Sequence, residues 1–245
     1  MLETDTLAYM TRKLRILIVE DEEAIRTGLV DVLIYHGYEV EYAADGTDGL
    51  KMALTGQYDL ILLDVMLPGI NGFDICNQLR GHDREQAIIM LTARSGDEDI
   101  IEGLSSGADD YVAKPFSVAQ LVLRIKAVLR RSSAPPEQAL HLQLGTLAID
   151  TQNLSGLRED TPCSFTRREM ELLQYLAASP SQAVSRSELL HKIWGYAKDA
   201  DIETRTVDIH IAKLRRKIEL NPSDPQHLIT VRGVGIRLDI HPASD

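Results

Sequence analysis

The side chains of the first half that can do polar chemistry lie where short aliphatic runs end. Glu20 and Asp21 come directly after one run, and Asp64 ends another. Thr92 ends a third run and Lys114 a fourth. In an open α/β sheet the ligand site lies beyond the carboxyl ends of the strands. We therefore expect three acids, a hydroxyl and an ammonium group to meet at one edge of a sheet.

The combined chemistry of these side chains is that of phosphoryl transfer. Clustered carboxylates repel one another unless a cation neutralises them. Oxygen ligands suit Mg²⁺, which typically binds one or two carboxylates and a phosphate. With the metal bound, Asp64 can attack phosphorus and form an acyl phosphate. Lys114 can neutralise phosphoryl oxygens, and Thr92 can donate a hydrogen bond to one of them.

Each of these residues also has a simpler structural explanation. Acids that follow a strand often lie at a helix N-terminus, where the macrodipole favours them by ~0.3–1 kcal/mol. Asp64 alone could cap a turn, Thr92 alone is an ordinary strand residue, and Lys114 alone is a solvated cation. The coincidence across four runs favours the functional interpretation.

The elements that position these residues alternate between strands and helices. Apolar residues such as Ile25, Leu29 and Leu33 recur at helical spacing between the runs. This alternation implies βαβ units and a parallel sheet, so we predict a doubly wound, five-stranded α/β domain at 14–131 after a tail at 1–13. The predicted strands are LRILIV (14–19), YEVEYA (38–43), DLILLD (59–64), AIIMLT (87–92) and DYVAK (110–114).

The pattern changes at SSAPPEQA (132–139), which is typical of a linker. Beyond it, LHLQLGTLAID (140–150) predicts a small antiparallel sheet, and LITVRGVGIRLDI (228–240) predicts a closing strand pair. We therefore predict a second, smaller α+β domain at 140–242. Helical patterns lie between its strands, near 167–178, 185–194 and 204–219.

The 204–219 segment combines an apolar face with a basic one. Val207, Ile211 and Leu214 recur on one side, whereas Ile209 and Ala212 are expected to be exposed on the other, among cations. Such a surface suits a DNA major groove, with cations for phosphates and small apolar groups for thymine methyls. The simpler alternative is a solvated helix face. The charged residues of 205–217 are Arg205, Asp208, Lys213, Arg215, Arg216 and Lys217.

Bulk composition fits a soluble, intracellular protein. The net charge is −11, but residues 1–131 carry 13 lysines and arginines against 22 acids, and residues 132–245 carry 13 against 15. Cys76 and Cys163 have no metal-type spacing and suggest a reducing compartment. No apolar run reaches the ~18 residues of a membrane span, and the N-terminal tail is not a secretory signal. We expect a cytoplasmic location without membrane contact; Met1 and Met10 are both candidate starts.

Motifs of the first half resemble the receiver domain of two-component response regulators. EDEE, LLDVMLPGINGFD, LTAR and GADDYVAKPF occur in order and span essentially the whole predicted domain. The resemblance implies that Asp64 accepts a phosphoryl group from the phosphohistidine of a sensor histidine kinase. It also implies that Asp21, Asp64 and the backbone carbonyl of Met66 bind Mg²⁺, with Glu20 acting through water.

The same resemblance implies a conformational switch. Thr92 and Tyr111 would be the switch pair, Lys114 the phosphate-sensing cation, and Lys114–Pro115 a cis peptide. Tyr111 taken alone is an ordinary strand aromatic. The protein would catalyse its own phosphorylation and dephosphorylation and would not otherwise be an enzyme.

Motifs of the second half resemble the winged helix-turn-helix of the OmpR/PhoB subfamily. FTRREMELLQYLA, VSRSELLHKIWG, TRTVDIHIAKLRRKIE and ITVRGVGIRL match nearly the whole domain. The resemblance implies a transcription regulator whose recognition helix is 204–219. Trp194 is expected in the core, and Ile236 replaces a usual wing tyrosine. The expected contacts to promoter DNA are Arg205, Thr206, Asp208, Ile209, His210, Ala212, Lys213, Arg215, Arg216 and, in the minor groove, Arg232.

Active members of this subfamily pair through the fourth helix, fifth strand and fifth helix, so the resemblance implies a homodimer on phosphorylation. Asp109, Asp110 and Arg124 match charged residues of that face, whereas Ile100 stands where a basic residue is common. Helical projection predicts that Leu123 is exposed. We expect a dimer face that is more apolar than usual; the alternative is that it packs against the chain's own linker or a different partner.

Three other functions fit less well. A phosphatase or phosphotransferase using Asp64 would need a second acid two residues on, where Met66 stands. An NTPase would need a G-x-x-x-x-G-K-[ST] loop, which the sequence lacks. A regulator that binds DNA without phosphorylation is disfavoured by the intact acids, Thr92 and Lys114. Beyond the kinase and DNA, RNA polymerase is a further candidate partner.

Overall fold

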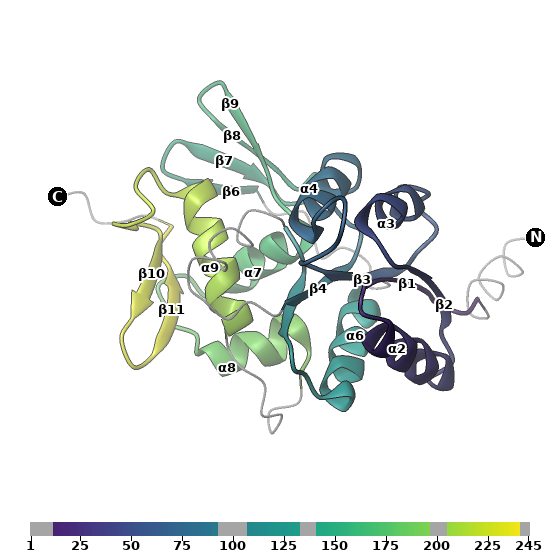
Figure 1. Cartoon of the computed structure of the whole chain (residues 1–245). Helices are drawn as coiled ribbons and strands as arrows, with labels where there is room; N and C mark the ends of the chain where they lie inside the picture. Colours follow the sequence, from purple (N-terminus) through teal and green to yellow (C-terminus); the bar gives the residue numbers. More distant parts are fainter. Residues whose placement is uncertain (1–11, 93–106, 133–140, 197–204, 241–245) are drawn as a thin grey trace, which may run out of the picture.

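The computed structural model describes residues 12–92, 107–132, 141–196 and 205–240, which form an α/β half and a smaller C-terminal half side by side (Figure 1). The α/β half contains a five-stranded parallel sheet in the order β2-β1-β3-β4-β5. All five predicted strands are present. They are β1 (Arg15–Val19), β2 (Glu39–Ala43), β3 (Leu60–Asp64), β4 (Ile88–Thr92) and β5 (Asp110–Ala113).

Helices cover both faces of this sheet, because successive strand residues point to opposite sides. Leu60 and Leu62 pack with α2 (Glu23–Tyr35) and α6 (Val118–Ser132). Ile61 and Leu63 pack with α3 (Gly46–Ala53) and α4 (Gly72–His82). Every residue of β3 is buried, so this central strand has the continuous apolar character of a strand in a parallel sheet. The sheet is doubly wound, as the alternating sequence pattern predicts.

The C-terminal half combines antiparallel strands with helices, as predicted for an α+β unit. The antiparallel sheet predicted at 140–150 is present, and two further strands extend it to four. The additional strands, SGLR and TPCS, contain glycine and proline, residues that are depleted in strands. The four are β6 (His141–Leu144), β7 (Leu147–Asp150), β8 (Ser155–Arg158) and β9 (Thr161–Ser164).

The helices and the closing hairpin follow this sheet. One helical segment changes character, since α8 (Arg186–Leu189) continues directly into a π-helical turn, η1 (Leu190–Trp194). Ile236 is fully buried, and its backbone exchanges two 2.8 Å hydrogen bonds with Val184. The isoleucine therefore belongs to the domain core. The remaining elements are α7 (Arg167–Ala177), α9 (Arg205–Ile218), β10 (Leu228–Val231) and β11 (Gly235–Leu238).

Candidate functional site

The three predicted acids meet at the carboxyl edge of the parallel sheet. One oxygen from each of Glu20, Asp21 and Asp64 can be chosen so that all lie within 4.8 Å of one another. Strands β1 and β3 are hydrogen-bonded neighbours in level register, with Val19 opposite Leu63, so the residues after them are brought together. Glu20 and Asp64 are buried, whereas Asp21 is exposed.

Lys114 joins this cluster from the end of β5. Its Nζ lies 2.7 Å from Asp64 Oδ2 and 2.8 Å from Glu20 Oε1. Burial alone would lower the pKa of Lys114, but hydrogen bonds from its ammonium to the two carboxylates outweigh burial and raise it. Burial raises the pKa of Glu20, and the nearby charge of Asp64 adds to that rise. The Lys114–Pro115 peptide is cis.

Backbone contacts fix the loops that carry the acids. The Arg26 guanidinium, on α2, donates to the carbonyl oxygens of Glu20 at 2.8 Å and Asp21 at 3.0 Å. The Met66 amide donates to Asp64 Oδ1 at 3.1 Å, and the Met66 side chain is half exposed. Sequence reasoning missed Arg26; the available signal was a cation in the first turn of the helix that follows Glu20 and Asp21.

This set of donors fits a hard divalent cation. All three side chains offer carboxylate oxygens, the ligand type that Mg²⁺ prefers. The Lys114 ammonium contacts two of the three clustered carboxylates, so an additional cation would relieve the remaining repulsion among them. Thr92 ends β4, beside β5, and its carbonyl accepts a 2.7 Å hydrogen bond from the Lys114 amide. The five residues singled out from strand ends therefore gather at one edge.

The predicted switch tyrosine contacts the predicted recognition helix. The Tyr111 hydroxyl accepts a 2.6 Å hydrogen bond from Lys213 Nζ, and the ammonium also lies 4.9 Å from the centre of the Tyr111 ring. His210 makes an edge-on contact with the same ring, with 6.4 Å between centroids. The Thr206 hydroxyl donates to Asp110 Oδ1 at 2.8 Å. Helix α9 therefore packs on β5 of the other half.

Two aromatic residues of the C-terminal half extend this contact. Trp194 Nε1 donates to the Asp109 carbonyl at 3.0 Å, and the Tyr196 hydroxyl donates to the Asp110 carboxylate. Trp194 is fully buried, as expected of a core residue. Burial, together with the charge of Asp110, raises the pKa of Tyr196. The contact of Trp194 with the α/β half is an additional role that the sequence did not predict.

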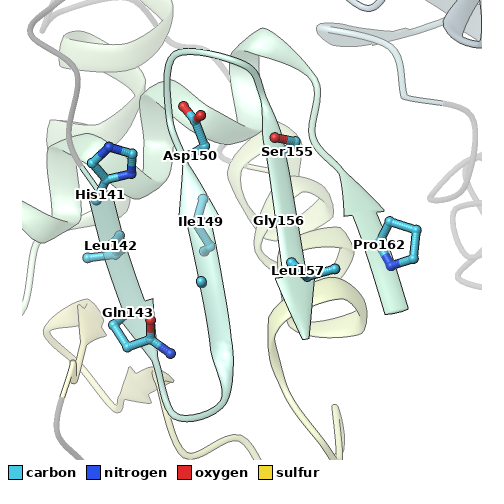
Figure 2. A pocket seen from close by; sticks show the side chains of 10 residues that line it. His141, Leu142, Gln143, Ile149, Asp150, Ser155, Gly156, Leu157 and Pro162 are labelled. Carbon is cyan, nitrogen blue, oxygen red and sulfur yellow. The ribbon is translucent and has the colours of Figure 1, made fainter. Parts of the chain in front are cut away.

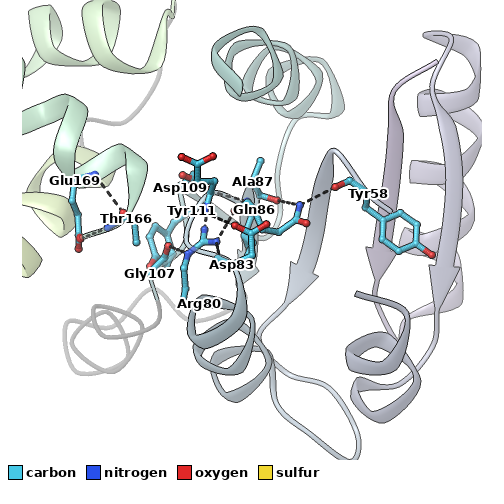
Figure 3. Close-up of polar contacts among 12 residues, drawn as sticks. Tyr58, Arg80, Asp83, Gln86, Ala87, Gly107, Asp109, Tyr111, Thr166 and Glu169 are labelled. Carbon is cyan, nitrogen blue, oxygen red and sulfur yellow. Dashed lines mark hydrogen bonds and ion pairs between the residues drawn. The ribbon is translucent and has the colours of Figure 1, made fainter. Parts of the chain in front are cut away.

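The charged residues of the predicted dimer face are engaged within the chain. The Asp109 carboxylate accepts hydrogen bonds from Arg80 at 3.0 Å and from the Ile88 amide at 2.8 Å (Figure 3). Arg124 Nη1 donates to both oxygens of Asp110, at 3.0 and 2.8 Å. In this conformation, therefore, these charged groups already have partners within the chain.

The other two members of that predicted face differ in what the structure describes. Leu123 is 52% exposed, in agreement with the helical projection. Ile100 lies outside the described residues.

The remaining predicted DNA contacts fall into exposed and covered groups. Thr206, His210 and Lys213 are buried against the α/β half. The expectation that Ile209 is exposed was wrong, because its side chain is only 5% exposed. A projection of one helix contains no information about what other parts of the chain pack against it.

The exposed group includes Arg216, Arg232 and Asp208, which pairs with Arg186 at 2.8 Å. Ala212 is partly buried. Arg215 is also partly buried and donates to the Leu228 carbonyl and to Thr230 Oγ1, both at 2.8 Å. The side chain of Arg205 is outside the described part of the chain.

A shallow hollow of about 430 Å³ lies elsewhere, on the outer face of the four-stranded sheet (Figure 2). Its lining includes His141, Asp150, Leu157 and Pro162. None of the predicted site residues lines it. Among the described residues, no helix is both long and apolar enough to cross a membrane.

Comparison with protein families gives two matches on this chain. Residues 16–126 match the response regulator receiver domain, and residues 160–238 match the C-terminal domain of transcriptional regulatory proteins. The first match contains the acid cluster and Lys114. The second contains α9 and the closing hairpin.

Relatives match along almost the whole chain. The DNA-binding response regulator MtrA of Mycolicibacterium smegmatis is 41% identical over 93% of this chain and 97% of its own. The transcriptional regulatory protein AfsQ1 of Streptomyces coelicolor is 44% identical over 91% of this chain and 97% of its own. Among solved structures, a mutant of RitR is 30% identical, covers 92% of this chain and 99% of its own, and superposes with a TM-score of 0.65.

Proposed function

The chain belongs to the OmpR/PhoB-type response regulators and is a DNA-binding response regulator; from this we propose that Asp64 is the phospho-acceptor and that α9 is the DNA-recognition helix. Relatives of this type are regulators rather than classical enzymes. We take 14–131 as the phospho-acceptor domain, 132–139 as the linker, and 140–242 as the DNA-binding domain.

The observation that carries the proposal is the placement of Asp64 against Lys114. Asp64 Oδ2 lies 2.7 Å from the ammonium, and Oδ1 accepts the Met66 amide at 3.1 Å, so the carboxylate is held in one orientation. An Asp64 oxygen would attack the phosphorus of a phosphohistidine. The new O–P bond forms as the P–N bond breaks, and the imidazole of the kinase leaves with the bonding pair.

The other residues would stabilise the charge that this transfer develops. Lys114 is placed to pair with phosphoryl oxygens once its contact with the Asp64 carboxylate is given up. Thr92, at the end of the neighbouring strand, would donate its hydroxyl to one of them. Glu20 through water, with Asp21, Asp64 and the Met66 carbonyl, would hold Mg²⁺, which when bound neutralises the carboxylates and the incoming phosphoryl group.

The transfer is tested by incubating the full chain with acetyl phosphate and Mg²⁺ and measuring the intact mass. We expect a gain of one phosphoryl group that is lost in Asp64→Asn. Asp31→Asn, which changes an exposed acid of α2, serves as the matched control and should be phosphorylated like the parent. A mass gain that persists in Asp64→Asn, or no gain in the parent chain, would exclude Asp64 as the acceptor.

The expected partners follow from the same proposal. They are a sensor histidine kinase in the cytoplasm, double-stranded promoter DNA, RNA polymerase and, after phosphorylation, a second copy of the chain. Selection of bound sequences from a random DNA library tests the proposed DNA binding. We expect the affinity to fall steeply as the salt concentration rises, because contacts to phosphates release counterions. Arg216→Ala should weaken binding to all sequences and flatten the salt dependence.

A further inference from the structure

Three residues on one side of α9 lie against the α/β half. Thr206, His210 and Lys213 follow helical spacing, so they share a face. Thr206 and Lys213 donate hydrogen bonds to Asp110 and Tyr111 of β5. All three are among the proposed DNA contacts. In this conformation, therefore, the α/β half covers part of the surface with which α9 would read DNA.

His210 lies at the centre of this covered face. Its ring is fully buried, 5.0 Å from the Trp194 ring and 6.4 Å from the Tyr111 ring, with edge-on geometry to both. Nδ1 lies 2.9 Å from the Thr206 carbonyl. Nε2 is buried and makes no hydrogen bond of good geometry among the described residues, although the Ala108 backbone is close enough to the ring to affect its pKa. A neutral imidazole can be buried in these surroundings at little cost. An imidazolium would be a buried charge without a paired acid, which is unfavourable.

The charged groups around His210 oppose a further positive charge. Burial has the largest effect in lowering the pKa of His210, and the charge of Lys213 on the same helix lowers it further. The hydrogen bond with the Thr206 backbone raises this pKa in part, Arg168 on α7 lowers it, and the Ala108 backbone raises it; the net direction is down.

The other elements packed against His210 offer little negative charge to compensate a protonated ring. Trp194 of η1 does not titrate, and Tyr111 already accepts the Lys213 ammonium. The two acids at the start of β5, Asp110 and the preceding Asp109, are each neutralised by an arginine of the α/β half. Asp109 pairs with Arg80 and Asp110 with Arg124.

We propose that His210 makes the contact between the two halves acid-sensitive, so that protonation of its ring separates α9 from β5 and uncovers the DNA-binding face without phosphorylation of Asp64. The inference rests on the proposed role of α9. Acid would then be a second signal, besides phosphorylation, that exposes the DNA-binding face of α9.

The direction of the effect follows from linkage. Once α9 is solvated, the pKa of His210 returns towards its ordinary value of ~6.5. The separated form then binds a proton that the closed form excludes. The closed contact is therefore fully favoured above pH ~6.5. Below it, the ratio of closed to separated forms falls by up to about tenfold for each pH unit.

The test uses the unphosphorylated full chain between pH 7.5 and 5.5. Trp194 is the single tryptophan, and its indole N–H reaches across the contact, so its fluorescence reports separation. Small-angle scattering gives the radius of gyration in parallel. We expect the emission to shift and the particle to expand below pH ~6.5, while far-UV circular dichroism stays constant.

Four variants decide the sensor. His210→Gln and His210→Phe should lose the acid response, and two replacements are used so that one misfolded variant does not end the test. His36→Gln removes an exposed histidine of the α/β half and should respond like the parent. Asp64→Asn should also respond, because the proposed sensor is independent of the acceptor. An unchanged response in a folded His210 variant, or its loss in Asp64→Asn, overturns the proposal.

A direct measurement needs no variant. The ring resonances of His210 in the parent chain should titrate over the pH range in which the particle expands. Titration at pH ~6.5 with no expansion would show that the ring is already solvated in the closed form, and would overturn the proposal. No arm measures phosphoryl transfer or DNA binding, so failure here is distinct from failure of the proposed function.

Discussion

At the scale of single residues, Lys213 is the side chain with two competing roles. It is a proposed DNA contact, yet its ammonium is buried on Tyr111, and burial lowers its pKa to about 8. A buried cation depends on its remaining partners, because removing one leaves charge without compensation. Removing the Tyr111 hydroxyl should therefore weaken the contact between α9 and β5.

Tyr111→Phe removes that acceptor and keeps the ring. We expect the closed contact to weaken by ~1.5–3 kcal/mol, the usual range for hydrogen bonds to charged groups. The unphosphorylated chain should then bind its DNA about 10-fold or more tightly, as measured by fluorescence anisotropy at fixed salt. Tyr58→Phe removes a tyrosine hydroxyl that bonds Glu41 within the α/β half, and should leave DNA affinity unchanged. Equal affinities for all three proteins would contradict the proposed coupling.

The sequence correctly predicted which polar side chains lie together at the strand ends. The positions of Glu20, Asp21 and Asp64 follow from a parallel sheet, whose strands all end at one edge. The surroundings of His210 could not be predicted in this way. Its partner in the α/β half, Tyr111, lies about a hundred residues earlier in the chain, and helical projection contains no information about which surface a second half will cover.

At the scale of elements, the start of α7 links the helices of the C-terminal half. The Thr166 side chain accepts the Glu169 amide at 3.3 Å, and Glu169 Oε2 accepts the Thr166 amide at 2.8 Å (Figure 3). The same carboxylate oxygen binds Lys217 of α9 at 2.5 Å. The capping glutamate therefore also ties the last turn of α9 to the start of α7.

Thr166→Ala should lower the free energy of unfolding by ~1–2 kcal/mol, because it removes a capping hydroxyl from a buried helix start. Urea denaturation followed by circular dichroism measures the change. Ser179→Ala replaces an exposed hydroxyl just beyond the other end of α7 and is expected to change stability by less than about 0.5 kcal/mol. Similar losses in the two variants would mean that the cap has no special role.

Element prediction was most accurate for long aliphatic runs. The five parallel strands and the closing hairpin have strong apolar patterns that tertiary packing preserves. Strands β8 and β9 were missed because Gly156 and Pro162 weaken the local signal, and the register with β7 determines their conformation instead. The π-helical turn within 190–194 was also missed, since helical periodicity does not distinguish the two helix types.

At the scale of the whole molecule, Asp110 joins the two halves. It is fully buried and binds Arg124 of its own half, together with Thr206 and Tyr196 of the other. The same aspartate and arginine belong to the predicted dimer face. We therefore propose that closure competes with the expected dimerisation for these groups, so that the chain has to open before it pairs.

Asp110→Asn keeps the shape of this side chain but removes its charge. Leaving Arg124 without its partner should weaken the closed contact by ~3 kcal/mol or more, since a buried charge loses compensation. Small-angle scattering at pH 7.5 should show an increased radius of gyration with unchanged secondary structure. Asp74→Asn, at an exposed position on α4, is the control. A compact Asp110→Asn chain would show that the other contacts suffice for closure.

The covered face of α9 also has an evolutionary consequence. The covered residues must fit β5 and, by our proposal, DNA; they are Thr206, His210 and Lys213. A substitution among them that alters the preferred promoter therefore also alters the stability of the closed contact between α9 and β5. Arg216 and Arg232 carry no such double constraint, since both are exposed. New promoter preferences should therefore arise most readily at these two positions, whereas changes on the covered face should be accompanied by compensating changes on β5.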